Sequence, residues 1–205
     1  MKPPPAIHSP DIETVSYWRL DARPEELTEI VLDPESIHFW CPMELMDSEV
    51  VERGRPDGLG MTIKVFTKGF LPYHLFLIAK IVDLVPHRFM AIAVQGDFEG
   101  LAHMSVEPVD ERICEAKFHW RTDIHHPWFR HFKRVLRPVF LWNHKWAMRR
   151  CRRLMQQEVY RRRNRSDRFS TARPTFPHNV RASQKLIRRR GSPPSWDETR
   201  SLENL

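Results

Sequence analysis

The sequence is poor in the features that mark membrane-spanning, secreted and disulfide-bonded proteins. Only three of its 205 residues are cysteines. They are too few and too far apart for a disulfide framework or a zinc knuckle, so we interpret them as small buried side chains in a reducing, cytoplasmic protein. The longest uncharged stretch of the predicted domain, residues 70–79, is about half of what a bilayer-spanning helix needs. A lysine and three prolines follow Met1 without an apolar run, so we expect no secretory signal.

The short motifs of nucleotide-binding proteins and serine hydrolases are also missing. There is no Gly-x-x-x-x-Gly-Lys, no Gly-x-Gly-x-x-Gly and no Gly-x-Ser-x-Gly. His125, His126 and His131 lie close together in sequence, but no cysteine or carboxylate completes a metal-ligand set at ordinary spacing. Asp97 and Glu99 flank a turn, where we interpret them as solvated rather than as an acid–base pair. We therefore predict no cofactor and no metal site, and we assign no catalytic residue.

The basic residues are concentrated at the C-terminal end of the chain. Residues 1–159 hold 21 Lys and Arg against 22 Asp and Glu, whereas residues 160–205 hold 12 against 4. The last segment has few bulky apolar residues and cannot offset the entropy cost of ordering, so a disordered basic tail is predicted over residues 161–205. Its arginine clusters, 161–163 and 188–190, could bind nucleic acid, an anionic membrane or an acidic protein, or could simply keep the chain solvated.

A single domain over residues 11–160 is predicted between this tail and a proline-rich, flexible N-terminus over residues 1–10. Residues 14–20 alternate like a strand. Asp21 stands before an acidic helix start, and Asp33-Pro34 ends that helix before a second short helical piece over residues 34–40. Six extended runs follow, each bounded by Gly, Pro or Asp: residues 45–52, 60–68, 73–85, 88–96, 98–108 and 112–124.

The short connections between these runs predict an antiparallel meander. After Pro127 a long helix extends to about Tyr160, and Pro138 should kink it or mark its start. The predicted fold class is therefore α+β: a curved antiparallel sheet of about six or seven strands around a long C-terminal helix, with two short helices after the first strand.

Alternation along the last two strands predicts which side chains face the long helix. The inward sets are Phe98, Gly100, Ala102, Met104 and Val106 on one strand, and Cys114, Ala116, Phe118, Trp120 and Thr122 on the other. The small residues Gly100, Ala102 and Ala116 lie among large aromatic side chains. This pattern favours a cavity for an apolar ligand, although an ordinary filled core would give the same composition.

The periodicity of the long helix predicts one face toward the sheet and one toward water. The sheet-facing set is Phe140, His144, Ala147, Met148, Cys151 and Met155, with Asn143 on its flank. His144 is either a core histidine bonded to a strand residue or a polar anchor for a ligand. Trp142 and Trp146 fall on the charged side, where either the chain termini cover them or they form a contact surface for a membrane or a partner.

Several short patterns, together with this order of elements, resemble a known superfamily. The patterns are Tyr17-Trp-Arg-Leu, Phe39-Trp40-Cys-Pro, Gly58-Leu-Gly-Met, Gln95-Gly-Asp-Phe-Glu-Gly, Phe118-His-Trp-Arg-Thr and Pro138-Val-Phe-Leu-Trp-Asn-His-Lys-Trp-Ala-Met. They span about residues 13–157 and resemble the SRPBCC or START-related helix-grip superfamily, in particular polyketide cyclase/dehydrase-like bacterial members of unassigned function. The resemblance implies a helix-grip fold with a ligand cavity between sheet and helix, and it implies no particular reaction.

The leading hypothesis is that the domain binds or transports a hydrophobic or aromatic small molecule in this cavity. The residues expected to line it are Trp18, Trp40, Phe98, Met104, Phe118, Trp120, Thr122, Phe140, Asn143, His144 and Met148. One alternative is a cyclase- or dehydratase-type enzyme that acts on a polyketide-like substrate, with His144 as general acid or base. Another is an interaction module that uses the basic tail on nucleic acid or an anionic membrane. Whether the chain is an enzyme, and how it oligomerises, stays open.

Overall fold

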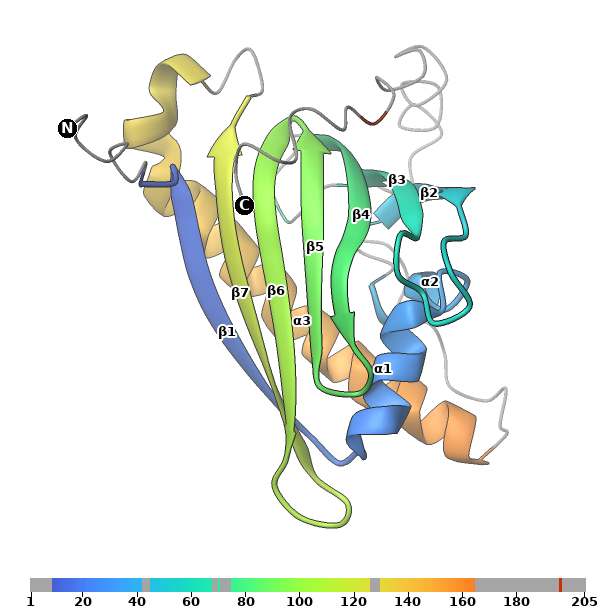
Figure 1. Cartoon of the computed structure of the whole chain (residues 1–205). Coiled ribbons are helices and arrows are strands. Elements are labelled where there is room, and N and C mark those ends of the chain that lie inside the picture. Colours follow the sequence, from blue (N-terminus) through green and yellow to red (C-terminus); the bar gives the residue numbers. More distant parts are fainter. Residues whose placement is uncertain are drawn as a thin grey trace, which may run out of the picture.

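The extended runs of the sequence form one seven-stranded antiparallel sheet (Figure 1). The computed structural model describes residues 9–41, 45–67, 70, 75–125, 130–164 and 196. The strands are β1 (Ile12–Leu20), β2 (Leu45–Glu52), β3 (Thr62–Thr67), β4 (Leu75–Val85), β5 (Phe89–Gly96), β6 (Phe98–Pro108) and β7 (Cys114–Ile124). Their order, β1-β7-β6-β5-β4-β3-β2, confirms the predicted meander from β2 to β7 and places β1 beside β7.

Two helical segments follow β1. Helix α1 (Pro24–Leu32) has Pro24 in its first turn, where a missing N–H costs nothing. Its N-cap is Arg23 rather than the predicted Asp21, and the Arg23 N–H donates to Glu26 Oε2 at 2.8 Å. The second expected helix is only a single turn, α2 (Ile37–Trp40). Asp21 is therefore free to bond elsewhere in the fold.

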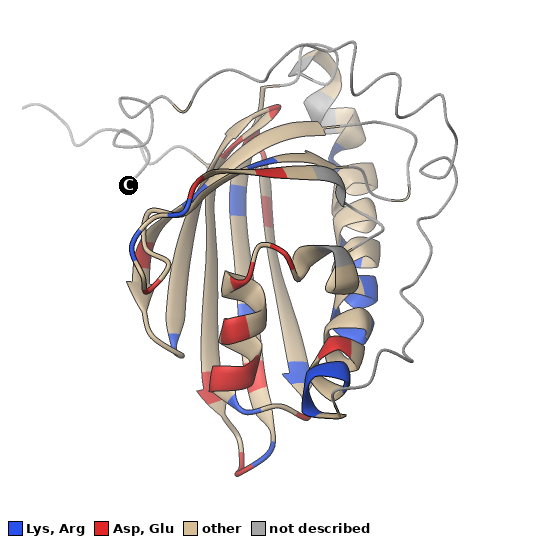
Figure 2. Cartoon of the chain, turned by 90° about the vertical axis from the view of Figure 1, so that its right-hand side faces the viewer, with Lys and Arg blue, Asp and Glu red and all other residues tan. Residues whose placement is uncertain are grey.

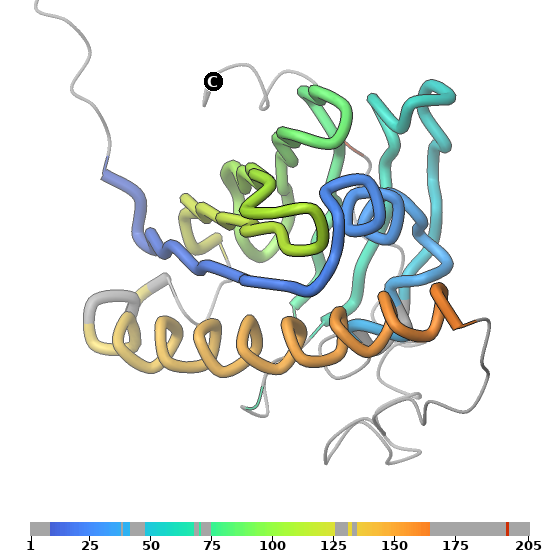
Figure 3. The backbone as a smooth tube through the Cα atoms, turned by 90° about the horizontal axis from the view of Figure 1, so that it is seen from below, coloured from blue at the N-terminus to red at the C-terminus, as the bar shows by residue number. Residues whose placement is uncertain are grey.

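A long helix closes the concave side of the sheet (Figures 1 and 3). After a short 3-10 turn, η1 (Arg130–Phe132), helix α3 runs over Lys133–Asn164. It passes through Pro138, which lies in its second turn, so this proline does not mark the helix start. The expected sheet-facing positions are buried, with Phe140 at 4%, Cys151 at 3% and Met155 at 0% exposure.

The core lies between this helix and the inward faces of the strands. Of the predicted inward sets of β6 and β7, six residues are buried, and Phe98, Gly100, Phe118 and Trp120 are partly buried; the buried ones are Ala102, Met104, Val106, Cys114, Ala116 and Thr122. Met104, Val106, Cys114 and Ala116 join α1 and α3 side chains in the main hydrophobic cluster. The three cysteines are buried, as predicted.

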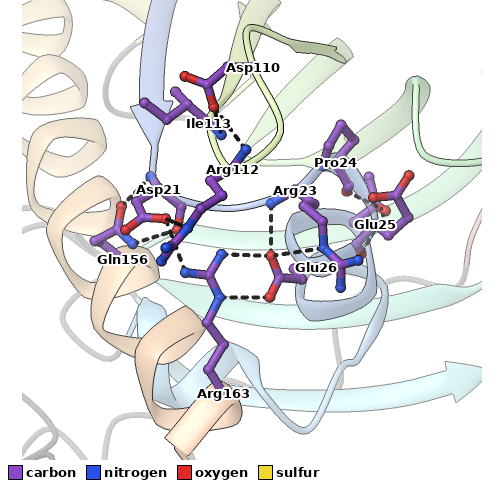
Figure 4. A network of polar contacts seen from close by, with 11 residues as sticks. Asp21, Arg23, Pro24, Glu25, Glu26, Asp110, Arg112, Ile113, Gln156 and Arg163 are labelled. Carbon is purple, nitrogen blue, oxygen red and sulfur yellow. Dashed lines mark hydrogen bonds and ion pairs between the residues drawn. The ribbon is translucent and has the colours of Figure 1, made fainter.

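The end of α3 is held to the N-terminal part of the domain by a polar network (Figure 4). Arg163 donates to both carboxylate oxygens of Glu26 at 2.8 Å and to Asp21 Oδ1 at 3.0 Å. Gln156 completes the attachment, because its amide exchanges two hydrogen bonds with the Asp21 backbone, at 2.9 and 3.1 Å.

The arginine cluster at residues 161–163 therefore belongs to the folded domain and not to the tail, which corrects the boundary predicted at residue 160. Arg161 and Arg162 both donate to Glu158, which is only 2% exposed. Burial opposes ionisation of Glu158, but these two arginines outweigh it and the pKa of the carboxyl is lowered. Residues 1–8 of the predicted flexible N-terminus and residues 165–205 of the tail lie outside the described residues, apart from Trp196, whose ring centroid lies 5.6 Å from Lys80 Nζ.

Candidate functional site

The interior between the sheet and α3 contains two apolar clusters. The larger one includes Trp18 of β1, Met104 of β6 and Met148 of α3. The smaller one lies toward the start of α3 and contains Ile12, Ile124 and Phe140, with Phe98 packed against them. On each of β1, β7 and α3, the chain passes from one cluster to the other within a few residues.

A layer of polar side chains separates the two clusters at this point. Thr14 lies between Ile12 and Trp18 on β1, and its strand partner on β7 is Trp120. On α3 the same level is occupied by His144, whose ring lies edge-on to Trp120 with 5.7 Å between centroids. We call Thr14, Trp120 and His144 the polar layer.

Each member of the polar layer carries a buried polar atom without a partner among the described residues. These atoms are Thr14 Oγ1, Trp120 Nε1 and His144 Nε2, and the indole Nε1 of Trp18 is a fourth. An unpaired polar group in a protein interior typically costs about 1–3 kcal/mol. Four such atoms inside one small core are unusual, because buried polar groups are generally hydrogen-bonded.

The electrostatics of the layer are those of neutral groups. Burial lowers the pKa of His144 to about 4, so the imidazole is uncharged near pH 7 and its Nε2 either donates or accepts one hydrogen bond. The two indole N–H groups can only donate, while a threonine hydroxyl does both. In the part of the chain that the structure describes, no Lys or Arg side chain is buried, so the layer holds no cation for a carboxylate.

The other expected site residues are placed as follows. Thr122 and Asn143 are buried at 5% and 6% exposure, beside the polar layer on β7 and α3. Asn143 is not an unpaired anchor, since its Oδ1 accepts a hydrogen bond from the Phe70 N–H at 2.8 Å. Trp40 lies against the larger cluster, and its indole N–H donates to Ser36 Oγ at 3.3 Å.

Aromatic contacts join several of these residues in pairs rather than in one ring. Trp18 and Phe118 lie 4.4 Å apart between ring centroids, and Phe98 lies 6.1 Å from Phe140. Gly100 is required by the close approach of the neighbouring strand, because a Cβ there would lie 2.1 Å from the Arg121 carbonyl oxygen. The structure therefore brings together Trp18, Phe118, Met104 and Met148 in one cluster, and Phe98 and Phe140 in the other.

Two features of the interior escaped sequence reasoning. Thr14 joins the layer only because β1 pairs with β7, a contact across more than one hundred residues that local patterns do not reveal. Cys41 and Cys151 lie with their sulfurs 3.1 Å apart, on the end of α2 and on α3. Their spacing in sequence gives no signal of this contact.

An open depression of about 490 Å³ lies at the other end of the domain and is lined by Asp21, Asp110, Glu111, Arg112 and Ile113. Asp21 is already bonded to Arg163, which lowers the pKa of its carboxyl. The depression is therefore lined in part by the polar network that holds the end of α3. Among the described residues, no cluster of His, Cys, Asp and Glu could hold a metal ion. The helices of that part of the chain include none long and apolar enough to cross a bilayer.

A curved antiparallel sheet closed by one long C-terminal helix, with polar groups buried between them, defines a helix-grip protein. The chain belongs to the family described as polyketide cyclase/dehydrase and lipid transport, which it matches over residues 14–156, and so to the SRPBCC superfamily. No curated protein matches the chain.

Solved structures show the same fold at low sequence identity. A START superfamily protein from Mycobacterium smegmatis has a TM-score of 0.59 at 16% identity, over 73% of this chain and 97% of the other. The Zhui aromatase/cyclase from a Streptomyces species has a TM-score of 0.58 at 11% identity, over 74% and 94%. A protein from Thermus thermophilus has a TM-score of 0.59 at 14% identity, over 73% and 97%.

Proposed function

We propose that this chain binds a hydrophobic or aromatic small molecule carrying a neutral hydroxyl or carbonyl group, in the interior between the sheet and α3. The observation that carries the proposal is the polar layer, whose three polar atoms are buried and unpartnered among the described residues. An oxygen atom of the ligand would accept from the Trp120 N–H and complete the hydrogen bonding of His144 and Thr14. The apolar body of the ligand would lie against the two clusters that flank the layer.

The charge of the layer narrows the ligand class. A fatty acid carboxylate would lose its hydration without gaining a cation, because the described interior contains no buried Lys or Arg. A phenol, alcohol, ketone or ester loses far less and gains the same hydrogen bonds. This argument favours polyketide-like phenols and neutral lipids over free fatty acids.

Binding is favoured over acid–base catalysis at His144. A general acid or base works best when its pKa lies near the working pH, and burial brings the pKa of His144 to about 4. At pH 7 a neutral imidazole with this pKa can orient an oxygen atom of the ligand, but very little of it is in the protonated form that a general acid needs. The cyclase or dehydratase alternative requires that a bound ligand raise the pKa of His144 toward the working pH.

The test is a pair of probes of almost the same shape, 2-naphthol and 2-methylnaphthalene, titrated into the full chain by calorimetry. The hydroxyl should make the naphthol bind about tenfold more tightly, since two net hydrogen bonds are worth roughly 1–2 kcal/mol. The double variant Trp120→Phe/His144→Leu should bind both probes with nearly equal affinity. The matched control is Trp142→Phe, which removes an exposed indole and should keep the preference.

Thermal unfolding of His144→Leu separates this proposal from a structural role. A ligand anchor becomes an apolar side chain with no protein partner lost, so the melting temperature should hold or rise. A loss of roughly 1–3 kcal/mol, with the naphthol preference intact, would show that His144 has a protein partner and would overturn the proposal.

A further inference from the structure

The outer side of α3 carries an exposed apolar stripe that no ligand in the interior could contact. Val135, Val139 and Trp142 of α3 follow one another at spacings of four and three residues, which places them on one side of the helix axis, and Phe132 of η1 precedes Val135 by three residues. In this order their exposures are 74%, 39%, 47% and 62%. We call these four residues the α3 stripe.

One aromatic residue from another part of the chain extends the stripe. Phe70, between β3 and β4, packs edge-on against Trp142 and Trp146, with ring centroids 5.5 and 5.4 Å away. Phe70 is itself 52% exposed. Phe70 shields the edges of both indoles and leaves Trp142 about half exposed, while most of the chain termini that were expected to cover them lie outside the described residues.

Every charged residue of α3 before Glu158 is basic. Between Asp123 and Glu158 the sequence contains nine Lys and Arg and no Asp or Glu. Lys145 and Arg149, one turn beyond Trp142 and Trp146, are exposed on the same half of the helix. Figure 2 shows basic positions on α3 and acidic positions on α1.

Exposed aromatic and aliphatic residues in one row, with cations beside them, are the pattern of a helix that lies in the interface of a membrane. Nucleic acid would use the cations but would leave Val135 and Val139 in water. A protein partner would need an apolar groove surrounded by acidic groups, which is a more specific requirement than an anionic bilayer has to meet. An anionic bilayer satisfies both halves of the pattern at once, because its headgroups attract the cations and its acyl boundary takes the stripe.

We propose that the α3 stripe, together with Phe70, docks the domain on the surface of an anionic lipid bilayer. Helix α3 lies along one side of the domain with one face free of the sheet (Figure 3), so it can lie flat on the surface. The ligand interior is on the opposite side of the same helix. In the docked state the membrane and the ligand-binding interior would lie on opposite faces of α3.

The experiment measures co-sedimentation of the full chain with sucrose-loaded vesicles of phosphatidylcholine, with and without 30% phosphatidylglycerol. We expect at least tenfold stronger partitioning onto the anionic vesicles. The variant Val135→Ser/Val139→Ser/Trp142→Ser should weaken it tenfold or more, and Lys145→Gln/Arg149→Gln should weaken it roughly tenfold. All five positions are exposed, and circular dichroism melting would verify that each variant folds as the wild type does.

The matched control removes two cations from the opposite side of the sheet. Arg19→Gln/Lys117→Gln changes exposed residues of β1 and β7 and should stay within twofold of the wild type. If the stripe variant sediments like the wild type, the basic tail accounts for the attraction and the proposal is wrong. Equal losses in the two charge variants, or binding to a DNA duplex without binding to vesicles, would also overturn it.

Discussion

The attachment of Arg163 to Glu26 and Asp21 gives a stability prediction with a defined pH dependence. The hydrogen bonds from Arg163 are the main reason that the pKa of Glu26 falls from 4.5 to about 2. Taken at face value, that shift corresponds to roughly 3 kcal/mol. About a fifth of the Glu26 side chain and over a third of the Asp21 side chain remain accessible to water, so we expect Arg163→Gln to cost about 1–2 kcal/mol at pH 7.

The sign of the pH effect follows from the direction of the shift. A carboxyl whose pKa is lower in the folded state stabilises the fold above its unfolded pKa and loses this contribution as the pH falls toward the folded value. The difference in unfolding free energy between the wild type and Arg163→Gln should therefore be full above about pH 5. It should shrink progressively between about pH 4.5 and pH 2.

Urea unfolding, followed by tryptophan fluorescence at several pH values, measures this difference directly. The control is Arg152→Gln, an exposed arginine on the same helix, which should change stability by less than about 0.5 kcal/mol at any pH. A difference that stays constant from pH 7 to pH 3 would refute the electrostatic explanation. It would assign the effect of Arg163 to packing.

Two further predictions concern the C-terminal end of α3 and the contact between Cys41 and Cys151. A chain that stops after Tyr160 should melt roughly 3–8 °C below one that stops after Asn164. The reason is that only the longer chain keeps the three arginines that bind Glu26, Asp33 and Glu158. Equal melting temperatures would show that residues 161–164 do not stabilise the domain. Treatment with diamide should oxidise Cys41 and Cys151 to one disulfide, with both electrons and both thiol protons passing to diamide. Titration of the denatured protein should then find one thiol instead of three. Three remaining thiols would show that the two sulfurs do not meet in solution.

The fold was predictable from the sequence because its signals are local. Alternation and turn residues located all seven strands, and the 3.6-residue period of α3 identified its buried face. These patterns depend only on neighbours along the chain. The confirmed inward positions of β6 and β7 are of this kind.

The errors concern residues whose partners are distant in sequence. Asp21 is of a residue type that commonly caps helices, but it bonds to Gln156, Tyr160 and Arg163 instead. Arg163 looked like part of a solvated tail because composition does not reveal that its partner Glu26 lies 137 residues earlier. The polar layer was predicted only in part for the same reason. The periodicity of their own helix and strand placed His144 and Trp120 in the interior, whereas placing Thr14 beside them requires knowledge of the β1–β7 pairing.

That pairing also has a consequence for how the chain folds. The meander from β2 to β7 is built from neighbouring segments, whereas β1 pairs with a strand that follows it by about a hundred residues. Loop closure of this length is slow relative to hairpin formation, so β1 should join the sheet late. A nascent chain would hold β1 unpaired until β7 emerges, and conservative substitutions in β1 would speed unfolding more than they slow folding.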